Sequence, residues 1–467
     1  MTRWILLLLS LTLLVMTHEL GHLLVAKLFR TRVRRFYIFF NWGFSIFKAR
    51  KFNGKWHFLF FNREEPNSWK DENLLPSDQN NTLWGLGWVP LGGYCDIAGM
   101  IDESKSSGDL PSEPQPWEYR SKPAWQRLCI VSAGVVVNFV SALLIFSMIF
   151  CHWGKDELPL RNATLGYNYI EPMHEEGFAD GDIIYAIDGR QQYDYADAGM
   201  SLLLDNPSTV TVMRDGALVD LNMSGRLLEK VNRKRADRLM SPRMPFVVKS
   251  LAAGSPAERA GMMPGDSVVS VGGKPMAAYS DIAPALAAAA DSDIVIGFYR
   301  QGRLDSVMLH LPQTGKLGVM LETDIARLFT VEHTSYSFFQ ALPAGIKFGW
   351  KTLVEYVSSL RAVFAPGGLQ ALGGFGTMSS IFPNHFDWQS FWSITAMLAL
   401  ILAFMNIIPI PGLDGGHSVL TLWEIVTGKK PGDRFLDVAQ SIGMLLLLAL
   451  MVLANGNDLW RWLSGKF

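Results

Sequence analysis

Residues 4–22 read WILLLLSLTLLVMTHELGH, and this stretch decides how the chain folds. Its first part is apolar, and a second apolar run, Leu23-Leu24-Val25-Ala26, follows the polar HELGH segment. A helix needs about 20 apolar residues to cross the hydrocarbon core of a bilayer. We therefore expect a first transmembrane helix over residues 1–26. A cleaved signal peptide is the alternative, but no small-x-small cleavage site follows the apolar run.

Three further apolar blocks meet or approach the same length. They predict transmembrane helices at residues 127–151, 390–411 and 438–455, the last of them marginal in length. Buried core helices are the alternative interpretation. Because the apolar residues are concentrated in blocks, the mean hydropathy over the whole chain is only +0.16. The charged fraction of 18% lies below the usual ~25%, which agrees with a chain that is partly membrane-embedded.

The overall composition excludes several classes of protein. The chain has 467 residues, with 42 Lys+Arg against 43 Asp+Glu, so it lacks the basic excess of a protein that binds nucleic acid. A hydrophobic fraction of 49% rules out a disordered chain. The three cysteines, Cys95, Cys129 and Cys151, share no CxxC spacing, so we expect neither a disulfide framework nor a cysteine zinc site.

Basic residues near the ends of the spans predict the orientation in the membrane. Lys and Arg gather after the first span, before the second and between the third and fourth. Cytoplasmic loops carry such an excess. We therefore expect residues 27–126 and 412–437 on the cytoplasmic side, and both termini and most of residues 151–389 outside.

The first span carries a metal-site motif. His18 and His22 are four residues apart, so on a helix they point from one face and can hold one ion. Glu19 lies beside them, where it can take a proton from water at the metal. An ionisable side chain at the membrane centre costs at least ~2.5–3.5 kcal/mol on insertion scales. Three such residues together therefore indicate a function, and the spacing favours zinc.

A third zinc ligand is expected at another membrane-embedded position. The end of the third span reads Asn406-Ile-Ile-Pro-Ile-Pro-Gly-Leu-Asp414, where two prolines end the helix and Asp414 supplies an oxygen ligand. A helix N-cap is the alternative role for Asp414. His417 competes as a ligand, although a histidine on a surface helix is the favoured interpretation for it.

These motifs together resemble the site-2 protease family of intramembrane metalloproteases, in particular members with four spans and two PDZ domains. The resemblance rests on His18-Glu19-x-x-His22 and on Asn406-x-x-Pro409-x-Pro411-x-Leu413-Asp414-Gly415. Further segments that match the family, in the right order, are Pro90-Leu91-Gly92-Gly93-Tyr94, Lys122–Arg127, Ala133-Gly134-x-x-x-Asn138 and Asn457-Asp458-Leu459-Trp460. Departures from the family are Val135 in place of a proline, Gly373–Gly376 in place of a GPxxI-like stretch, and an insertion at residues 61–82.

The resemblance implies a zinc endopeptidase of a bacterial inner membrane, with its active site toward the cytoplasmic side. His18, His22 and Asp414 would hold the zinc, and Glu19 would act as the base. Asn406 would contact the substrate carbonyl or the oxyanion, since amides can stabilise developing charge. The implied substrates are single-span membrane proteins of the anti-sigma factor type and remnant signal peptides, cut after their outer domains have been removed.

An aromatic segment follows the first span. Residues 35–47 carry many aromatic side chains, with Gly43 as a turn point, and predict a β-hairpin that dips toward the membrane. Its edge could pair with an unwound substrate, and we expect Gly43, Phe44, Ser45 and Ile46 to do so. A hairpin that lies on the membrane, with its aromatics at the interface, is the compatible alternative.

Two similar modules occupy the outer region, over residues 160–240 and 241–325. The sequence of residues 177–189 parallels that of residues 261–273, which predicts two copies of one module. The second resembles a PDZ domain of bacterial proteases, and the first is more degenerate. We expect Pro245-Phe246-Val247-Val248 to line a peptide groove. The resemblance implies a size filter, and peptide binding stays open beside it.

Amphipathic helices are expected between the second module and the third span, over residues 326–389. Apolar residues recur at helical spacing through residues 335–364. This pattern predicts a helix on the outer membrane surface.

Two other classes of function stay open. The first is a catalytically silent membrane scaffold that acts through its PDZ pair, and the intact His18, Glu19, His22 and Asp414 set argues against it. The second is a metal transporter, which should show ionisable residues along several spans, whereas here they collect at one depth.

Overall fold

The computed structural model describes residues 2–70, 73–75, 78–90, 92–100, 113–234, 239–360, 363 and 372–464. Leu91 of the PLGGY segment, and Pro76 and Ser77 of the insertion, lie outside these residues. The chain divides into two compact units. The first comprises residues 1–154, 335–357 and 372–467, and the second comprises residues 155–334 and 358–371.

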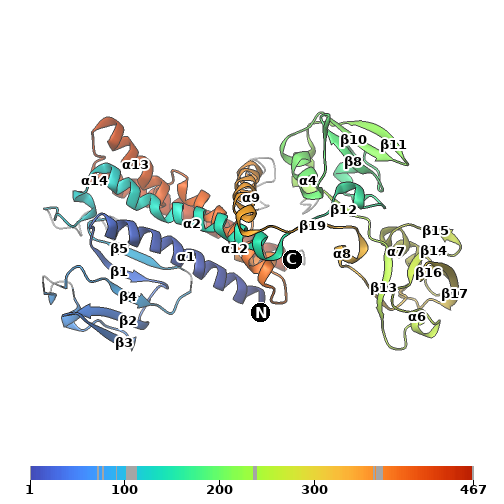
Figure 1. The fold of residues 1–467 in the computed structure, drawn as a ribbon, viewed down its shortest axis with the longest axis horizontal. Coiled ribbons are helices and arrows are strands. Elements are labelled where there is room, and N and C mark those ends of the chain that lie inside the picture. The colour runs from blue at the N-terminus through green and yellow to red at the C-terminus, as the bar shows by residue number, and fades with distance from the viewer. Residues whose placement is uncertain are drawn as a thin grey trace. The chain divides into compact units, whose positions relative to one another are not determined.

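Among the described residues of the first unit, four helices are long and apolar enough to cross a membrane. They are α1 (Thr2–Leu28), α2 (Ala124–Trp153), α12 (Trp388–Ile407) and α14 (Asp433–Leu463). Figure 1 shows α1 in blue beside α2 in teal, and these two helices share a buried apolar core with α12 that includes Leu7, Phe146 and Leu398. The four helices match the four expected spans, and α14 is longer than the expected 438–455 because it runs from Asp433 to Leu463.

The stretch 412–437, expected to be a loop, contains a helix. α13 (Asp414–Thr427) begins at the proposed metal ligand and ends at Gly428, which has a left-handed φ of 70°. It packs against α2 through a hydrogen bond between Ser132 and Ser418, 3.2 Å long, and through an ion pair between Arg127 and Glu424. The segment is therefore part of the helical core that positions Asp414.

The residues between α1 and α2 form a five-stranded sheet. Its strands are β1 (Val33–Tyr37), β2 (Ser45–Phe52), β3 (Lys55–Asn62), β4 (Leu83–Leu86) and β5 (Tyr94–Ile97). Their order in the sheet is β3-β2-β4-β1-β5, so β3 and β5 are its edges. β5 packs against α1, which places this edge beside the helix that carries the histidine pair.

The prediction of a β-hairpin at residues 35–47 is wrong. β1 and β2 are not neighbours, because β4 lies between them, parallel to β1 with Phe36 opposite Trp84 and antiparallel to β2 with Phe47 opposite Leu86. The hairpin is instead formed by β2 and β3 around a turn at Asn53 and Gly54, both with positive φ. The segment that brings β4 back is the insertion at residues 61–82, whose Trp69 is buried.

Helix α9 (Phe338–Ser359) belongs largely to the first unit and packs along α2. Its buried residues are Ala341, Gly345 and Gly349, spaced four apart, a pattern that lets membrane helices approach closely. A Cβ at Gly345 would lie 2.4 Å from the Ser147 backbone nitrogen. The expected helix is present, and its place on the outer membrane surface stays a prediction; Phe339, near its start, is exposed.

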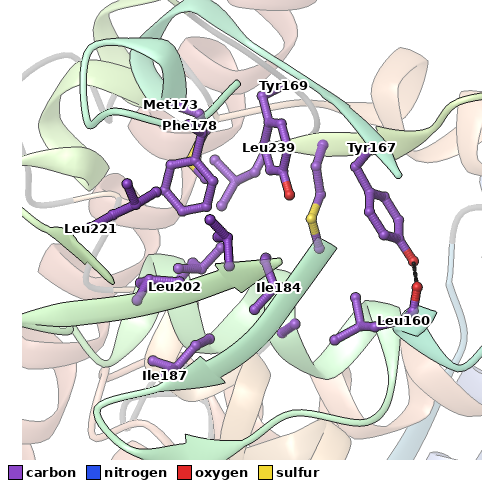
Figure 2. Close-up of a cluster of buried hydrophobic side chains, with 14 of the residues drawn as sticks. Leu160, Tyr167, Tyr169, Met173, Phe178, Ile184, Ile187, Leu202, Leu221 and Leu239 are labelled. Atoms are coloured by element: carbon purple, nitrogen blue, oxygen red, sulfur yellow. Dashed lines mark hydrogen bonds between the residues drawn. The ribbon is translucent and has the colours of Figure 1, made fainter. Parts of the chain in front are cut away.

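The second unit contains two modules whose first seven elements follow the same order of strands and helices. The first module has β7 (Tyr167–Tyr169), α3 (Glu171–His174), β8 (Ile183–Ile187), β9 (Arg190–Gln191), α4 (Tyr195–Leu204), β10 (Thr209–Arg214), β11 (Ala217–Asn222), α5 (Leu227–Lys234) and β12 (Met240–Pro242). Its core gathers Tyr169, Phe178, Ile184 and Leu202, and Figure 2 shows these side chains between the helices and the sheet.

The second module follows directly. It has β13 (Phe246–Leu251), α6 (Pro256–Arg259), β14 (Ser267–Val271), β15 (Lys274–Pro275), α7 (Tyr279–Ala288), β16 (Asp293–Arg300), β17 (Arg303–His310), β18 (Val319–Leu321) and α8 (Ile325–Leu328). A strand pair between β6 (Lys155–Glu157) and β19 (Glu332–Thr334) joins the two ends of the second unit.

A buried ion pair recurs at the same place in both modules. Arg214 binds Asp182 and the Gly177 carbonyl in the first, and Arg300 binds Asp266 and the Gly261 carbonyl in the second. Burial disfavours the ionised form of Asp266, but its hydrogen bonds to Arg300 outweigh this effect and hold the pKa of that carboxyl below its usual range. The parallel between residues 177–189 and 261–273 therefore has a structural counterpart in this turn.

The prediction that Pro245–Val248 line a peptide groove is also wrong. β13 is an inner strand, with Phe246 opposite Val268 of β14 and Val248 opposite Leu321 of β18. Phe246 and Val248 are buried in the module's core. The sheet order β17-β16-β14-β13-β18 leaves β17 and β18 as its edges within the described residues.

Candidate active site

The histidine pair lies where α1 and α2 approach each other closely. Both His18 and His22 are buried on the face of α1 that meets α2. Two glycines make this approach possible. A Cβ at Gly21 would lie 2.7 Å from the Ala133 carbonyl oxygen, and a Cβ at Gly134 would lie 2.5 Å from His22 Nε2. Gly134, the glycine of the AGxxxN segment, therefore lies directly against both imidazole rings and leaves room for them.

Asp414 joins the two histidines at the first turn of α13. Its Oδ2 lies 3.1 Å from His18 Nε2 and 3.3 Å from His22 Nε2, and the two Nε2 atoms are 3.2 Å apart. Zinc bonds to nitrogen are about 2.0–2.1 Å long, so neighbouring corners of a tetrahedral site are about 3.3 Å apart. The three atoms thus already have the separations that one zinc ion requires of three ligands.

The hydrogen bonding of these atoms also fits a metal. Asp414 Oδ2 is buried and accepts no hydrogen bond from the described residues. His22 Nδ1 lies 2.9 Å from the Ile130 carbonyl oxygen, which can only accept, so Nδ1 carries the proton. The lone pair of His22 is then on Nε2, directed at Asp414. A buried oxygen without a donor beside a nitrogen lone pair is the arrangement that a cation completes.

Two prolines and α2 place Asp414. Pro409 and Pro411 follow the end of α12 at Ile407, so the chain turns and starts α13 at Asp414 itself. A Cβ at Gly415 would lie 2.5 Å from the Ile407 carbonyl oxygen, so the turn needs glycine there. Asp414 thus stands at the first turn of a helix that is held on α2, the helix that also supports His22.

A cavity of about 630 Å³ opens beside the three ligand atoms. Residues from several segments line it, including His18, Glu19, His22, Asn406, Asp414, His417, Gly92, Gly93, Tyr94 and Cys95. Glu19 and Asn406 are half-buried. The structure therefore brings the expected base, the expected amide and the expected ligands around one space.

Some expected residues lie elsewhere. Residues 43–46 do not line this cavity, whereas Phe40 and Asn41 do. His417 lines it, but the group of described residues placed to hold one metal ion contains His18, His22 and Asp414 without it. The favoured interpretation of His417 as a non-ligand agrees with this placement.

Two contributors were missed in the sequence. The Ile130 carbonyl is a backbone group, so no side-chain pattern could have revealed it. The second contributor is the edge strand β5. The Pro90–Tyr94 segment leads into it, and the resemblance matched this segment to the family but assigned it no function. Its glycines have close neighbours: a Cβ at Gly93 would lie 2.4 Å from the Tyr37 carbonyl oxygen.

Two histidines, a carboxylate and an adjacent glutamate that converge among apolar helices define a metal-dependent hydrolase of the membrane. The chain belongs to peptidase family M50, whose model matches residues 6–62 and 71–450. It is a zinc metallopeptidase, and its resemblance to the site-2 proteases is confirmed.

Similar proteins come from several bacteria and match over nearly their whole length. A Neisseria meningitidis protein that carries the name zinc metalloprotease is 25% identical over 97% of this chain and 98% of its own. The metalloprotease MmpA of Caulobacter vibrioides is 27% identical over 99% and 96%. The regulator of sigma E protease of Haemophilus influenzae is 24% identical over 97% of each chain.

Proposed function

We propose that the protein is an intramembrane zinc endopeptidase of regulated intramembrane proteolysis, which cuts single-span membrane proteins. The observation that carries this proposal is that one ligand atom each of His18, His22 and Asp414 converge within 3.1–3.3 Å of one another, with both histidines on α1, a helix long and apolar enough to span a membrane. The donor set is two imidazole nitrogens and one carboxylate oxygen, which is a set that catalytic zinc uses.

The roles of the surrounding residues follow from their positions. When bound, zinc supplies a Lewis acid that polarises the scissile carbonyl and makes water a better nucleophile at neutral pH. Glu19 takes a proton from the attacking water and later donates it to the leaving amine. Asn406 lines the same cavity, so its amide N–H can donate to the oxygen on which negative charge develops.

The open edge of β5, rather than residues 43–46, would pair with the backbone of the unwound substrate. Tyr94 and Cys95 line the cavity, and β5 pairs with β1 on one side and with no strand on the other among the described residues. A helix must unwind before a protease can cut it, and an open strand edge can satisfy the backbone groups that unwinding exposes. The substrate would thus lie between β5 and the zinc ligands.

The sheet's other edge would face lipid. Trp56, Phe58 and Phe60 alternate along one face of β3 and are 51–65% exposed. Exposed aromatic side chains in this pattern suit the interface of a bilayer. This placement keeps the expected membrane association, but assigns it to the β2–β3 hairpin.

A thiol on β5 allows this alignment to be tested. In a Glu19→Gln background with Cys129 and Cys151 replaced by alanine, Cys95 is the single thiol. We expect it to form a disulfide with a cysteine placed near the cut site of a bound single-span substrate. The measurement is the yield of cross-linked product on mild oxidation.

The matched control moves the thiol to the strand expected earlier, with Cys95→Ser and Ile46→Cys in the same background. We expect this variant to cross-link weakly, since Ile46 does not line the cavity. Stronger cross-linking through Ile46→Cys than through Cys95 would show that the substrate pairs with β2.

The two modules of the second unit are proposed to be periplasmic PDZ domains. The shared order of their first seven elements and their equivalent ion pairs support two copies of one module. We propose that they screen substrates by size, so that only proteins already trimmed outside reach the cavity. A peptide would add to the β18 edge of the second module, since β13 is paired on both sides.

The proposed setting is a bacterial inner membrane, with both termini and the modules periplasmic and the zinc site toward the cytoplasm. The bacterial relatives and the four apolar helices support this assignment. Anti-sigma factors and signal-peptide remnants are the proposed substrates, and the name of the Haemophilus influenzae relative supports the first class.

The experiment that tests the function uses the purified full chain with a library of single-span substrates. We expect cleavage to stop when a chelator removes zinc and to return when zinc is added back, because the three ligand residues cannot activate water or polarise the carbonyl without the ion. Cleavage that survives complete zinc removal would contradict the proposal, and so would failure to cut any trimmed substrate.

A further inference from the structure

One fully buried polar side chain contacts the histidine site from α2. Asn138 is 0% exposed, in the middle of a helix that is otherwise apolar at this depth. Its amide lies between two residues of α1: Nδ2 is 3.4 Å from His18 Nδ1, and Oδ1 is 3.1 Å from Thr17 Oγ1. The two ends of a carboxamide have the same shape, so a half-turn of the amide exchanges nitrogen and oxygen without moving any neighbour.

The donors and acceptors around Asn138 decide between the two orientations. The Thr17 hydroxyl has one hydrogen, and the Leu14 carbonyl oxygen, 3.0 Å away, can only accept it. Thr17 Oγ1 then has no hydrogen left for Asn138, but it can accept one. With Nδ2 toward Thr17, one amide N–H donates to Thr17 Oγ1, and Oδ1 of Asn138 faces His18 Nδ1.

This orientation fixes the tautomer of His18. An amide oxygen can only accept, so Nδ1 carries the proton and the lone pair lies on Nε2, 3.1 Å from Asp414 Oδ2. The same logic holds for His22, whose Nδ1 donates to the Ile130 carbonyl oxygen. Ile130, Gly134 and Asn138 are four residues apart, so all three lie on one face of α2.

We propose that Asn138 is a positioning residue for the zinc site, which orients His18 through an acceptor on its Nδ1–H. The inference rests on the proposed zinc site, and it extends that site to α2. One face of α2 serves both imidazoles, with a backbone oxygen for His22, a side-chain oxygen for His18 and a glycine between them that leaves room for the rings.

The expected effect follows from how outer partners act on metal ligands. A hydrogen-bond acceptor on the far nitrogen fixes the ring and raises its basicity, and its loss costs about 10–100-fold in metal affinity. Asn138→Leu keeps the volume but removes the acceptor, so we expect zinc affinity to fall in this range. Asn138→Asp keeps an acceptor of the same shape, so we expect affinity close to that of wild type.

The experiment measures zinc affinity by chelator competition in the purified full chain, for wild type, Asn138→Asp and Asn138→Leu. Thermal unfolding of the zinc-free proteins checks that the variants fold. The control is Ser147→Ala, which removes another buried polar group of α2 that bonds to the Leu143 and Leu342 carbonyls away from the histidines. We expect its zinc affinity to be unchanged.

The outcomes separate this inference from the proposed function. If the wild-type protein binds no zinc, or if its zinc affinity equals that of the His22→Ala variant, the proposed function itself is contradicted. Wild type that binds zinc no better than a folded Asn138→Leu variant would overturn only the role of Asn138. If Asn138→Leu does not fold, Asn138→Asp decides: retained affinity supports the acceptor, and a tenfold loss, the low end of the ~10–100-fold range for such partners, overturns it.

Discussion

Glu19→Gln is expected to slow cleavage by about 10²–10⁴-fold, the usual contribution of a positioned acid–base group. Glu19 lines the cavity beside the histidine pair, and glutamine has nearly the same shape but cannot take a proton from water. The measurement is the single-turnover rate on a trimmed single-span substrate.

Zinc content distinguishes this effect from damage to the site. Glu19 is not among the three residues whose atoms converge, so Glu19→Gln should hold one zinc per chain, as wild type does. His22→Ala should lose both zinc and activity. A Glu19→Gln protein that cleaves at the wild-type rate would contradict the assigned mechanism.

Gly134→Ala is expected to abolish both zinc binding and cleavage. The added Cβ would lie 2.5 Å from His22 Nε2, 2.6 Å from His18 Cε1 and 2.7 Å from His18 Nδ1. These rings can move away only by leaving the positions in which their lone pairs meet Asp414. We expect at least about 100-fold weaker zinc binding, the upper end of what the loss of an outer partner costs.

Gly456→Ala is the matched control, since Gly456 lies in another apolar helix and a Cβ there would meet no atom within 4 Å. Alanine favours a helix over glycine by up to about 1 kcal/mol, so this variant should be as active as wild type and no less stable. Zinc binding by Gly134→Ala at wild-type strength would contradict the described packing of α1 against α2.

The spans and the zinc ligands could be predicted because their signals are local. The four-residue spacing of His18 and His22 follows from helix geometry, and Asp414 stands out because Pro409 and Pro411 end the preceding helix. The apolar blocks needed only length. None of these predictions depends on which distant segments become neighbours.

The errors all concern neighbours that come from far along the chain. β4 enters between β1 and β2 after an excursion of about 20 residues, and no local pattern marks where a returning strand will pair. β18 covers β13 from some 70 residues away, so Phe246 and Val248 became core rather than groove. The packing of α9 on α2, by contrast, was simply not predicted, because the role of its glycines depends on the partner helix.

The central claim is that the protein cuts a peptide bond inside a membrane-spanning segment at the His18, His22 and Asp414 site. The most direct test is mass spectrometry of the products formed by the zinc-loaded protein from a trimmed single-span substrate in liposomes. We predict one main cut within the apolar span and, with Glu19→Gln, at least about 100-fold less product in the same time. Cuts confined to the loops outside the span, or the same cut made by Glu19→Gln at the wild-type rate, would contradict the claim.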